Sequence, residues 1–252
     1  MKKPKIAVLD GDILAYKASF WADVEGIDVL EDRLSLDIKR WTPAGVKKTI
    51  IAFSCPRSEN FRRDHWSRYK AHRDGSAQPD CLGYSVEILY DNANCKAINK
   101  LEADDLMGLA ASNGSAIAVT IDKDLRGVPG WHWNPDKEEE PVFIEEEEAD
   151  RFFFKQWMTG DSTDGIPGLW RVGPKKADKY LNDWAKGEWV SNIFDLYNNE
   201  TRPNPEEDYG EMTRDQFAMS MAWCVRILRD GEYNKKKNSI NLWEPHNWVK
   251  GE

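Results

Sequence analysis

Acidic side chains occur in four short clusters along the chain, and these clustered carboxylates are the residues best suited to chemistry. Because like charges disfavour one another's ionisation, such a cluster at one point would repel itself and keep some of its groups protonated, and divalent cations would remove this cost. Carboxylate and water oxygens suit Mg²⁺ or Mn²⁺. Two such ions about 4 Å apart can clamp the attacking and leaving oxygens of a phosphodiester during an in-line displacement. The eight acids are Asp10, Glu102, Asp104, Asp105, Asp122, Asp124, Asp161 and Asp164.

Each cluster also has an ordinary interpretation, because acids coat most soluble proteins. Asp104 and Asp105 suit the first turn of a helix, where the helix dipole favours negative charge. Asp122 and Asp124 suit a simple turn. The runs at 138–140 and 145–148 are more acidic but follow no strand end, so we interpret them as solvated surface.

Position in the expected fold favours a joint site. Short apolar runs at residues 5–9, 48–53 and 116–121 predict strands buried on both faces, as in a parallel sheet between helices. Asp10 follows the first run and Asp122 the third, and ligands bind outside the carboxyl ends of such strands. Together with a helical pattern at 101–112, these runs predict an α/β fold up to about residue 145.

The chain beyond residue 145 has helical patterns. A helix is expected over 145–159, closed by Gly160, and another over 174–186, opened by Pro174. Thr213 and Gln216 form a capping-box pattern that opens a third helix. The expected division is an α/β domain over 1–145, a helical subdomain over 146–232 and a polar tail over 233–252, whose tryptophans pack back onto the protein.

Composition excludes several classes of protein. The chain has 252 residues, of which 40% are apolar and 31% charged, as in globular proteins. No apolar run is long enough to span a membrane or to form a signal peptide, so we expect a cytoplasmic protein. The four cysteines and four histidines show no zinc-ligand spacing. The net charge of −9 leaves a nucleic-acid partner open, because residues 57–73 carry six Lys or Arg against two acids.

Six short motifs occur in an order that resembles the 5′-nuclease superfamily. This superfamily includes flap endonucleases, the 5′-exonuclease domain of bacterial DNA polymerase I and bacteriophage 5′–3′ exonucleases. The resemblance covers residues 5–185, and the short length and the Asp-Gly-Asp-Ile opening resemble a phage member most. The ordered set is far more specific than any one motif. The motifs are LDGD at 9–12, YKAHR at 69–73, LEADD at 101–105, TIDKD at 120–124, GDSTDGIPG at 160–168 and VGPKKA at 172–177.

The resemblance implies a PIN-like fold, with a mostly parallel sheet flanked by helices, a clamp or arch within 60–100, and a helix-three-turn-helix element in the helical subdomain. It implies a structure-specific 5′–3′ exonuclease or flap endonuclease that hydrolyses DNA at or near 5′ ends with two Mg²⁺ or Mn²⁺ ions. The implied partners are DNA with 5′ ends or flaps, and RNA–DNA hybrids as a further class. We expect a monomer with no membrane partner, in the host cytoplasm if a phage encodes it.

The family's motifs imply a role for each matching residue. Lys70 and Arg73 match the basic pair beside the scissile phosphate, where they would neutralise developing charge. Tyr69 would stack on a base near the 5′ end. If this stretch is helical, the i, i+3, i+4 spacing places Arg62 on the same face as these residues, where it would contact DNA. One ion would be held by Asp10, Glu102, Asp104 and Asp105, and the other by Asp122, Asp124, Asp161 and Asp164.

A glycine turn before the helix at 174 would hold the DNA backbone. Exposed N–H groups at a helix start bind phosphate, and lysines there add positive charge. The expected DNA contacts are Gly168, Arg171, Gly173, Lys175 and Lys176. The family's turn usually has a glycine where this chain has Arg171. The change adds a cation for phosphate and weakens the expectation of a monovalent cation, which the family often binds at 168–173.

Two further positions depart from the family pattern. An acid usually follows the second strand, where this chain has Ser54. The first ion would then be held more weakly or through water. Asp12 is an extra acid with no settled family role, and it would either face the ions or cap the following helix.

Two other functions stay open. A catalytically weak protein that binds branched DNA for a partner is supported only by Ser54, and it leaves the remaining acids unexplained. A PIN-type ribonuclease would share the chemistry but act on RNA. Small PIN ribonucleases resemble only the front half of the chain, so the glycine turn favours duplex DNA.

Overall fold

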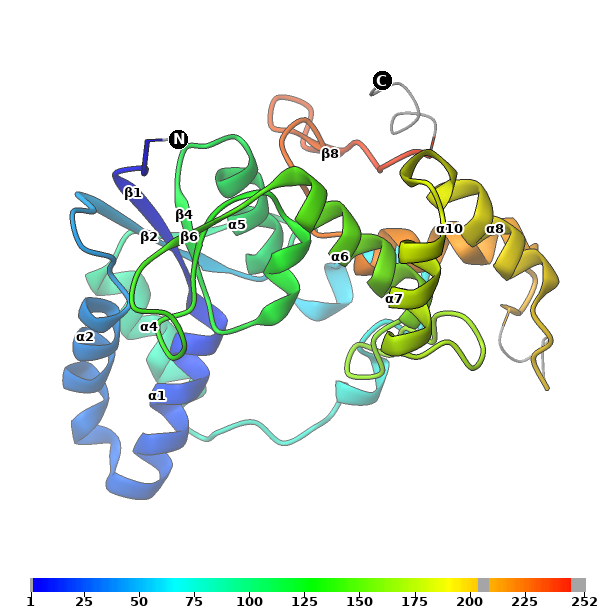
Figure 1. Cartoon of the computed structure of the whole chain (residues 1–252). Coiled ribbons are helices and arrows are strands. Elements are labelled where there is room, and N and C mark those ends of the chain that lie inside the picture. Colours follow the sequence, from blue (N-terminus) through cyan, green and yellow to red (C-terminus); the bar gives the residue numbers. More distant parts are fainter. Residues whose placement is uncertain (1, 204–208, 246–252) are drawn as a thin grey trace. The chain divides into compact units, whose positions relative to one another are not determined.

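The computed structural model describes residues 2–203 and 209–245 (Figure 1). The chain divides into two compact units. The first comprises residues 1–60, 75–149 and 227–239, and the second comprises residues 61–74, 150–226 and 240–252. The tail expected at 233–252 is thus shared between the units, and its Trp248 lies outside the described residues. No described helix is both long and apolar enough to cross a membrane.

The first unit is built on a six-stranded sheet in the order β3-β2-β1-β4-β5-β6. Neighbouring strands run parallel except for the antiparallel pair of β5 and β6, which confirms the expected mostly parallel sheet. The three apolar runs form β1, β2 and β4. The other three strands have the sequences CKA, GWHW and VFI, which are too short for a strand prediction. The strands are β1 (Ile6–Asp10), β2 (Lys48–Phe53), β3 (Cys95–Ala97), β4 (Ile117–Val119), β5 (Gly130–Trp133) and β6 (Val142–Ile144).

Helices cover both faces of this sheet, because successive side chains of a strand point to opposite sides. Ile51 and Phe53 of β2 pack among α1, α2 and α4, whereas Ala52 packs on the other face with α5. Both faces of the central strands are therefore buried, which explains their continuous apolar sequences. The helices of this unit are α1 (Gly11–Glu25), α2 (Leu30–Arg40), α4 (Leu82–Asn92) and α5 (Ala103–Ser112), and its 3-10 turns are η1 (Ile27–Val29), η2 (Arg57–Glu59) and η4 (Lys123–Gly127).

The segment 60–100, where a clamp or arch is expected, is divided between the two units, and its role as a clamp stays a prediction. Residues 75–100 belong to the first unit, where α4 packs against α1 and β3 pairs with β2 at the sheet edge. Leu89 of α4 is buried, and the hydroxyl of Ser85 lies 2.6 Å from that of Ser19 in α1. Residues 61–74 belong instead to the second unit. Helix α4 has an apolar side, and this side packs against α1 and α2 in the first unit.

The second unit is helical, as expected, and has an aromatic core. The indole of Trp157 donates to the Ala218 carbonyl at 2.7 Å, and the hydroxyl of Tyr197 donates to the Trp157 carbonyl at 2.7 Å. Trp243 packs against Phe153, so the return of the tail is confirmed for this residue. The helices here are α3 (Arg62–His65), α6 (Glu146–Thr159), α7 (Pro174–Asp183), α8 (Trp189–Asn199) and α10 (Arg214–Val225), with the turns η3 (Ala71–Arg73) and η5 (Lys186–Glu188). The short strands β7 (Tyr233–Asn234) and β8 (Ser239–Ile240) form a separate pair.

Helix ends follow the signals in the sequence. Helix α6 stops at Gly160, whose φ of 64° is a conformation that glycine adopts without strain. Helix α7 begins with Pro174 and ends at Asp183 rather than at residue 186. Thr213 caps α10, and Gln216 completes the expected capping box.

Gly11 lets α1 start directly against β2. A Cβ atom at this position would lie 2.6 Å from the Ala52 carbonyl oxygen and 2.7 Å from Ile51 Cγ2. We expect Gly11→Ala to lower the free energy of unfolding by about 1–3 kcal/mol, because the packed sheet has no room for the methyl group. Gly83→Ala in α4 is the matched control, since no atom lies within 4 Å of a Cβ there. Urea unfolding measures both, and a Gly11→Ala variant as stable as the wild type would contradict this packing.

Candidate functional site

Asp10 lies at the carboxyl end of β1 and is only 3% exposed. Each of its two carboxylate oxygens accepts a hydrogen bond, and the two donors come from different parts of the unit. The Ile13 N–H of α1 donates to Oδ1 at 3.1 Å, and the Thr120 hydroxyl, just after β4, donates to Oδ2 at 2.8 Å. The same hydroxyl accepts the backbone N–H of Asp122 at 3.1 Å. One hydroxyl therefore links Asp10 and Asp122 at the ends of two neighbouring parallel strands.

The negative charges at this sheet edge work against one another. Burial, with the charges of Asp12 and Asp122, raises the pKa of the Asp10 carboxyl to about 7, although its hydrogen bonds from Ile13 and Thr120 act in the other direction. An adjacent cation would favour the ionised carboxylate, because opposite charge offsets the cost of burial. This edge of the sheet therefore carries an excess of negative charge, which a divalent cation would neutralise.

Ser54 stands where the family usually has an acid, and it joins the starts of two helices. Its backbone N–H donates to the nearer carboxylate oxygen of Asp12 at 3.2 Å. Its hydroxyl accepts the N–H of Ala103, the first residue of α5, at 3.0 Å. Because Asp10 itself caps α1, the structure excludes the capping role expected as one option for Asp12. Asp12 instead lies at the same edge as Asp10.

Three acids open α5, and they differ in their surroundings. Glu102 is the N-cap residue and is 8% exposed, and Asp104 in the first turn is partly exposed. Asp105 is completely buried, and its oxygens accept backbone N–H groups of Glu102 at 3.0 Å and Leu228 at 3.1 Å. Asp105 therefore ties the start of α5 to the segment 227–239. These contacts suit a residue that positions its neighbours, and its role as an ion ligand stays a prediction.

Asp122 and Asp124 follow β4, where the exposed Asp122 accepts the Asp124 N–H at 2.8 Å and Asp124 pairs with Lys123 at 3.5 Å.

Burial and the charge of Glu102 raise the pKa of the Cys55 thiol to about 11, so this edge offers oxygen ligands rather than a thiolate. Such donors fit Mg²⁺ or Mn²⁺. Across residues 2–203 and 209–245, no group of three Asp, Glu, His or Cys side chains is arranged to hold a metal ion.

Asp161 and Asp164 lie in the second unit, in a turn whose two ends meet at Gly160 and Gly168. Asp161 pairs with Ile166 through two backbone hydrogen bonds of 2.8 Å. Gly160 and Gly168 both have positive φ, and a Cβ atom on Gly168 would lie 2.3 Å from the Gly160 nitrogen. Only glycine fits at this crossing, so the local sequence determines the shape of the turn.

Lys70 and Arg73 lie beside Asp164, so the structure brings the expected basic pair to one of the expected ion ligands. Lys70 Nζ is 3.6 Å from Asp164 Oδ2, and Arg73 Nη2 is 2.8 Å from Oδ1. The Tyr69 hydroxyl donates to the same carboxylate at 3.3 Å. Lys70 has a left-handed φ of 52°, and its backbone N–H donates to the Asp164 carbonyl at 2.8 Å. Strained backbone of this kind clusters at functional sites.

Arg62 is buried, which contradicts its expected contact with DNA. It is 1% exposed, and its guanidinium donates to the carbonyls of Cys224 at 3.0 Å and Arg226 at 2.7 Å. A buried charge needs such partners, so Arg62 joins the segment 61–74 to the end of α10. The expected continuous helical face is also absent, because α3 ends at His65 and Trp66 is extended.

Tyr69 and Gly168 are buried as well, which corrects two more expected DNA contacts. Tyr69 is 2% exposed and packs in the aromatic core, so its ring is not available to stack on a base. The Gly168 carbonyl accepts a hydrogen bond from the Arg202 guanidinium. Gly168 therefore shapes the turn, and Tyr69 contributes its ring to packing and its hydroxyl to Asp164.

The start of α7 presents the remaining residues expected to contact DNA. Arg171, Gly173, Lys175 and Lys176 are all exposed. No side chain caps the helix at Gly173, and Pro174 is its first residue. Arg171 has a φ of 58°, a conformation that glycine adopts with less strain. Exposed cations beside a helix start suit phosphate, and their contact with DNA stays a prediction.

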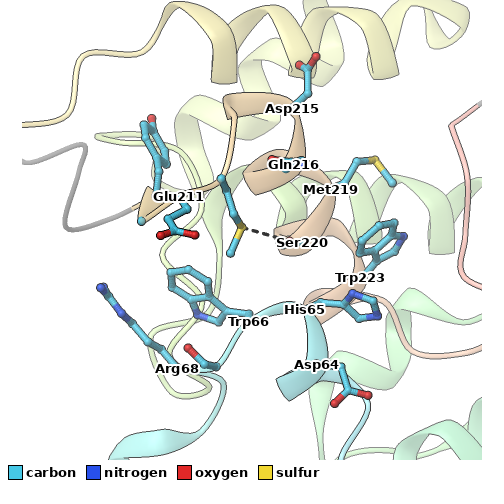
Figure 2. A pocket seen from close by; sticks show the side chains of 14 residues that line it. Asp64, His65, Trp66, Arg68, Glu211, Asp215, Gln216, Met219, Ser220 and Trp223 are labelled. Atoms are coloured by element: carbon cyan, nitrogen blue, oxygen red, sulfur yellow. Dashed lines mark hydrogen bonds between the residues drawn. The ribbon is translucent and has the colours of Figure 1, made fainter.

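A cavity of about 850 Å³ lies within the second unit, between the segment 61–74 and α10 (Figure 2). Trp66 contributes apolar surface to it. Asp64, Glu211 and Asp215 outnumber Arg68 among the charged groups of its lining. This excess of carboxylates disfavours phosphate, so we do not place a DNA contact there.

Thr120 belongs to this site although its residue type gave no reason to expect a role. Its hydroxyl holds Asp10 and Asp122 together, as described above. The signal that identifies it is a hydroxyl residue directly between a buried strand and an acidic pair. Ser54 is similar. From the sequence it is only the residue that replaces the family's usual acid, whereas in the structure it forms hydrogen bonds with both Asp12 and Ala103.

Known proteins are similar to this chain along nearly its whole length. It is 26% identical over 288 residues to the exodeoxyribonuclease of Enterobacteria phage T3, and this alignment covers 95% of this chain and 93% of the relative. It is 26% identical over 286 residues to the exonuclease of Escherichia phage T7, with 95% and 93% covered. No protein-family model matches the chain.

A solved structure supports the fold independently. The bacteriophage T5 flap endonuclease in complex with DNA and metal ions has a TM-score of 0.59 at 15% identity, covering 87% of this chain and 90% of that one. At this identity the likeness concerns the fold alone. The two phage relatives match the sequence itself, and the six motifs occur in the family's order. The sequence and the fold are therefore both similar to those of phage nucleases, in agreement with the resemblance to the 5′-nuclease superfamily.

Proposed function

We propose that the chain is a structure-specific 5′–3′ exonuclease or flap endonuclease, which hydrolyses DNA phosphodiester bonds at or near 5′ ends with Mg²⁺ or Mn²⁺. The observation that carries this proposal is the buried Asp10 carboxylate, placed among further acids at the end of parallel strands. The similarity to two phage nucleases over 95% of the chain supports the same reaction.

The first unit would hold the ions through carboxylates that its own hydrogen bonds orient. Thr120 orients Asp10, and Ser54 joins Asp12 to the start of α5. When bound, the ions supply an activated water and neutralise the leaving oxygen. The proposed ligands in this unit are Asp10, Glu102, Asp104, Asp122 and Asp124, with Asp12 beside them.

The second unit would contribute cations for the phosphate. Lys70 and Arg73 pair with Asp164, which the family resemblance makes an ion ligand together with Asp161. If Asp164 held an ion, Lys70 and Arg73 would be left to neutralise the charge that develops on the phosphate. The exposed cations at the start of α7 would hold the DNA backbone, so the protein would recognise DNA structure rather than base sequence.

A 5′-labelled flap on duplex DNA, incubated with Mg²⁺ or with EDTA, tests this reaction directly. We expect release of short 5′-labelled products only with Mg²⁺, leaving a 5′ phosphate and a 3′ hydroxyl. Shifted but uncut DNA in both Mg²⁺ and Mn²⁺ would favour the branched-DNA-binding protein, for which the missing acid at Ser54 is the reason. Faster cleavage of a matched RNA flap would favour a PIN-type ribonuclease.

Removal of a proposed ion ligand should stop the chemistry and spare DNA binding. We expect Asp122→Ala to slow single-turnover flap cleavage by roughly 100-fold or more, with little change in an electrophoretic shift, because the cations for phosphate are intact. Glu139→Ala is the control, since Glu139 is an exposed acid in the run 138–140. Cleavage by Asp122→Ala at the wild-type rate would show that Asp122 holds no ion.

The role of Lys70 separates chemistry from binding. Lys70→Met keeps most of the side-chain stem and removes the charge, so we expect kcat to fall by roughly 100-fold while KM changes much less. Lys179→Met, at an exposed position of α7, should keep the wild-type values. A rise in KM at unchanged kcat would make Lys70 a phosphate anchor only.

The link through Ser54 predicts effects on both stability and ion binding. Ser54→Ala removes the acceptor for the Ala103 N–H, which should cost about 0.5–2 kcal/mol, as the loss of a helix cap does. We expect weaker Mg²⁺ binding by calorimetry as well, because the acids that open α5 are less firmly held. Ser54→Thr keeps the hydroxyl and should restore both properties. If the alanine variant matches the threonine variant in both, the link has no such role.

A further inference from the structure

A buried ion pair lies beside the turn that precedes α7. Arg202 Nε donates to Glu200 Oε1 at 2.7 Å, and the two side chains are only 3% and 6% exposed. A buried charge is costly unless its remaining polar atoms also find partners. The partners of this pair therefore show which parts of the second unit it joins.

The pair bonds to the backbone of residues 168–170. Glu200 Oε2 accepts the N–H of Trp170 at 2.6 Å, and the Arg202 guanidinium donates to the carbonyl of Gly168. Hydrogen bonds that involve a charged group are stronger than those between neutral groups. One carboxylate and one guanidinium thus hold the backbone directly before Arg171.

Tyr209 and the helices α8 and α10 hold the pair in place. The Tyr209 hydroxyl donates to Glu200 Oε1 at 2.5 Å. Burial and this hydrogen bond raise the pKa of Tyr209 to about 12, so the hydroxyl keeps its proton at pH 7. Arg214 of α10 donates to the Glu200 carbonyl at 2.8 Å and to the Tyr197 carbonyl of α8 at 3.1 Å. The side chains that hold the turn are thus themselves held by the core of the unit.

Arg171 is the side chain that this turn presents. It is exposed, and its guanidinium lies over the ring of Trp170, 5.7 Å from the ring centroid. Its φ of 58° costs free energy for a residue other than glycine, and such a conformation persists only where the surroundings hold it. The bonds to Trp170 and Gly168 supply that support immediately before it in the chain.

We propose that Glu200 and Arg202 are positioning residues for DNA binding, which hold residues 168–170 so that Arg171 is fixed in place to contact a phosphate of the duplex. The inference rests on the proposed function, because that function makes Arg171 a DNA contact. A side chain that is ordered beforehand loses less conformational entropy when DNA binds. The charge of Glu200 does not repel the phosphate from this turn, since Arg202 balances it.

Binding of a 5′ flap on duplex DNA in EDTA, measured by fluorescence anisotropy at a series of salt concentrations, tests this role without cleavage. We expect Glu200→Gln to weaken binding roughly tenfold. The slope of log Kd against log salt should fall by about one, as it does when one phosphate contact is lost. The sign is informative, because removal of a negative charge would by itself strengthen binding to DNA. Glu188→Gln, at an exposed acid just before α8, is the control and should not weaken binding.

A double-mutant cycle separates positioning from a general loss of structure. Arg171→Ala should cause the same losses of affinity and slope as Glu200→Gln. The double variant should lose no more than either single variant, because both changes remove the same contact. Arg202→Lys keeps the charge but not the planar fork that reaches both Glu200 and Gly168, so it should show the same losses. It replaces Glu200→Gln in the cycle if circular dichroism shows that the glutamine variant does not fold.

Four results would overturn the inference. They are losses that add in the double variant, weaker binding with an unchanged salt slope, wild-type affinity in a folded Glu200→Gln or Arg202→Lys protein, and wild-type affinity in Arg171→Ala.

The same data separate this inference from the proposed function. A protein that cuts flaps in Mg²⁺ but shows additive losses overturns only the inference. A protein that binds flaps with the expected non-additive losses but never cuts DNA in Mg²⁺ or Mn²⁺ overturns only the proposed function.

Discussion

The cost of placing charge on the Asp10 carboxyl, which is only 3% exposed, is the constraint around which the sheet edge of the first unit is arranged. Burial and neighbouring acids raise its pKa to about 7, so the charged form needs compensation near neutral pH. Donors from α1 and from Thr120 supply part of it. The strand order β2-β1-β4 matters because it places three strand ends at one edge, where carboxylates from distant parts of the chain can share a cation.

The two units balance their acids in different ways. In the second unit, Asp164 pairs with Lys70 and Arg73, so its negative charge is already met by cations. In the first unit, the charges of Asp12 and Asp122 act on Asp10, and both disfavour its ionisation. Crowded carboxylates gain more from a divalent ion than paired ones do. We therefore expect the metal dependence of folding stability and activity to originate mainly in the first unit.

Backbone N–H groups set the positions of the acids in the first unit. Asp105 accepts the Leu228 N–H, so a segment far along the chain determines where α5 starts. Ser54 connects the same helix start to Asp12. Helix starts offer unpaired N–H groups, and side chains that accept them fix both the helix and themselves. Hydrogen bonds from backbone N–H groups thus determine the geometry of the acids that would hold an ion.

Local patterns in the sequence by themselves indicated the resemblance to 5′-nucleases, the central strands and the helix signals at Gly160, Pro174 and Thr213, because each depends only on nearby residue types. The sequence also predicted that acids would gather at the ends of strands, since the carboxyl ends of parallel strands lie at one edge of the sheet. Only the tertiary structure decided that Arg62 and Tyr69 are buried and that residues 75–100 form a helix and an edge strand. The physical reason is that burial depends on what packs opposite a side chain, and that surface comes from residues distant in the sequence.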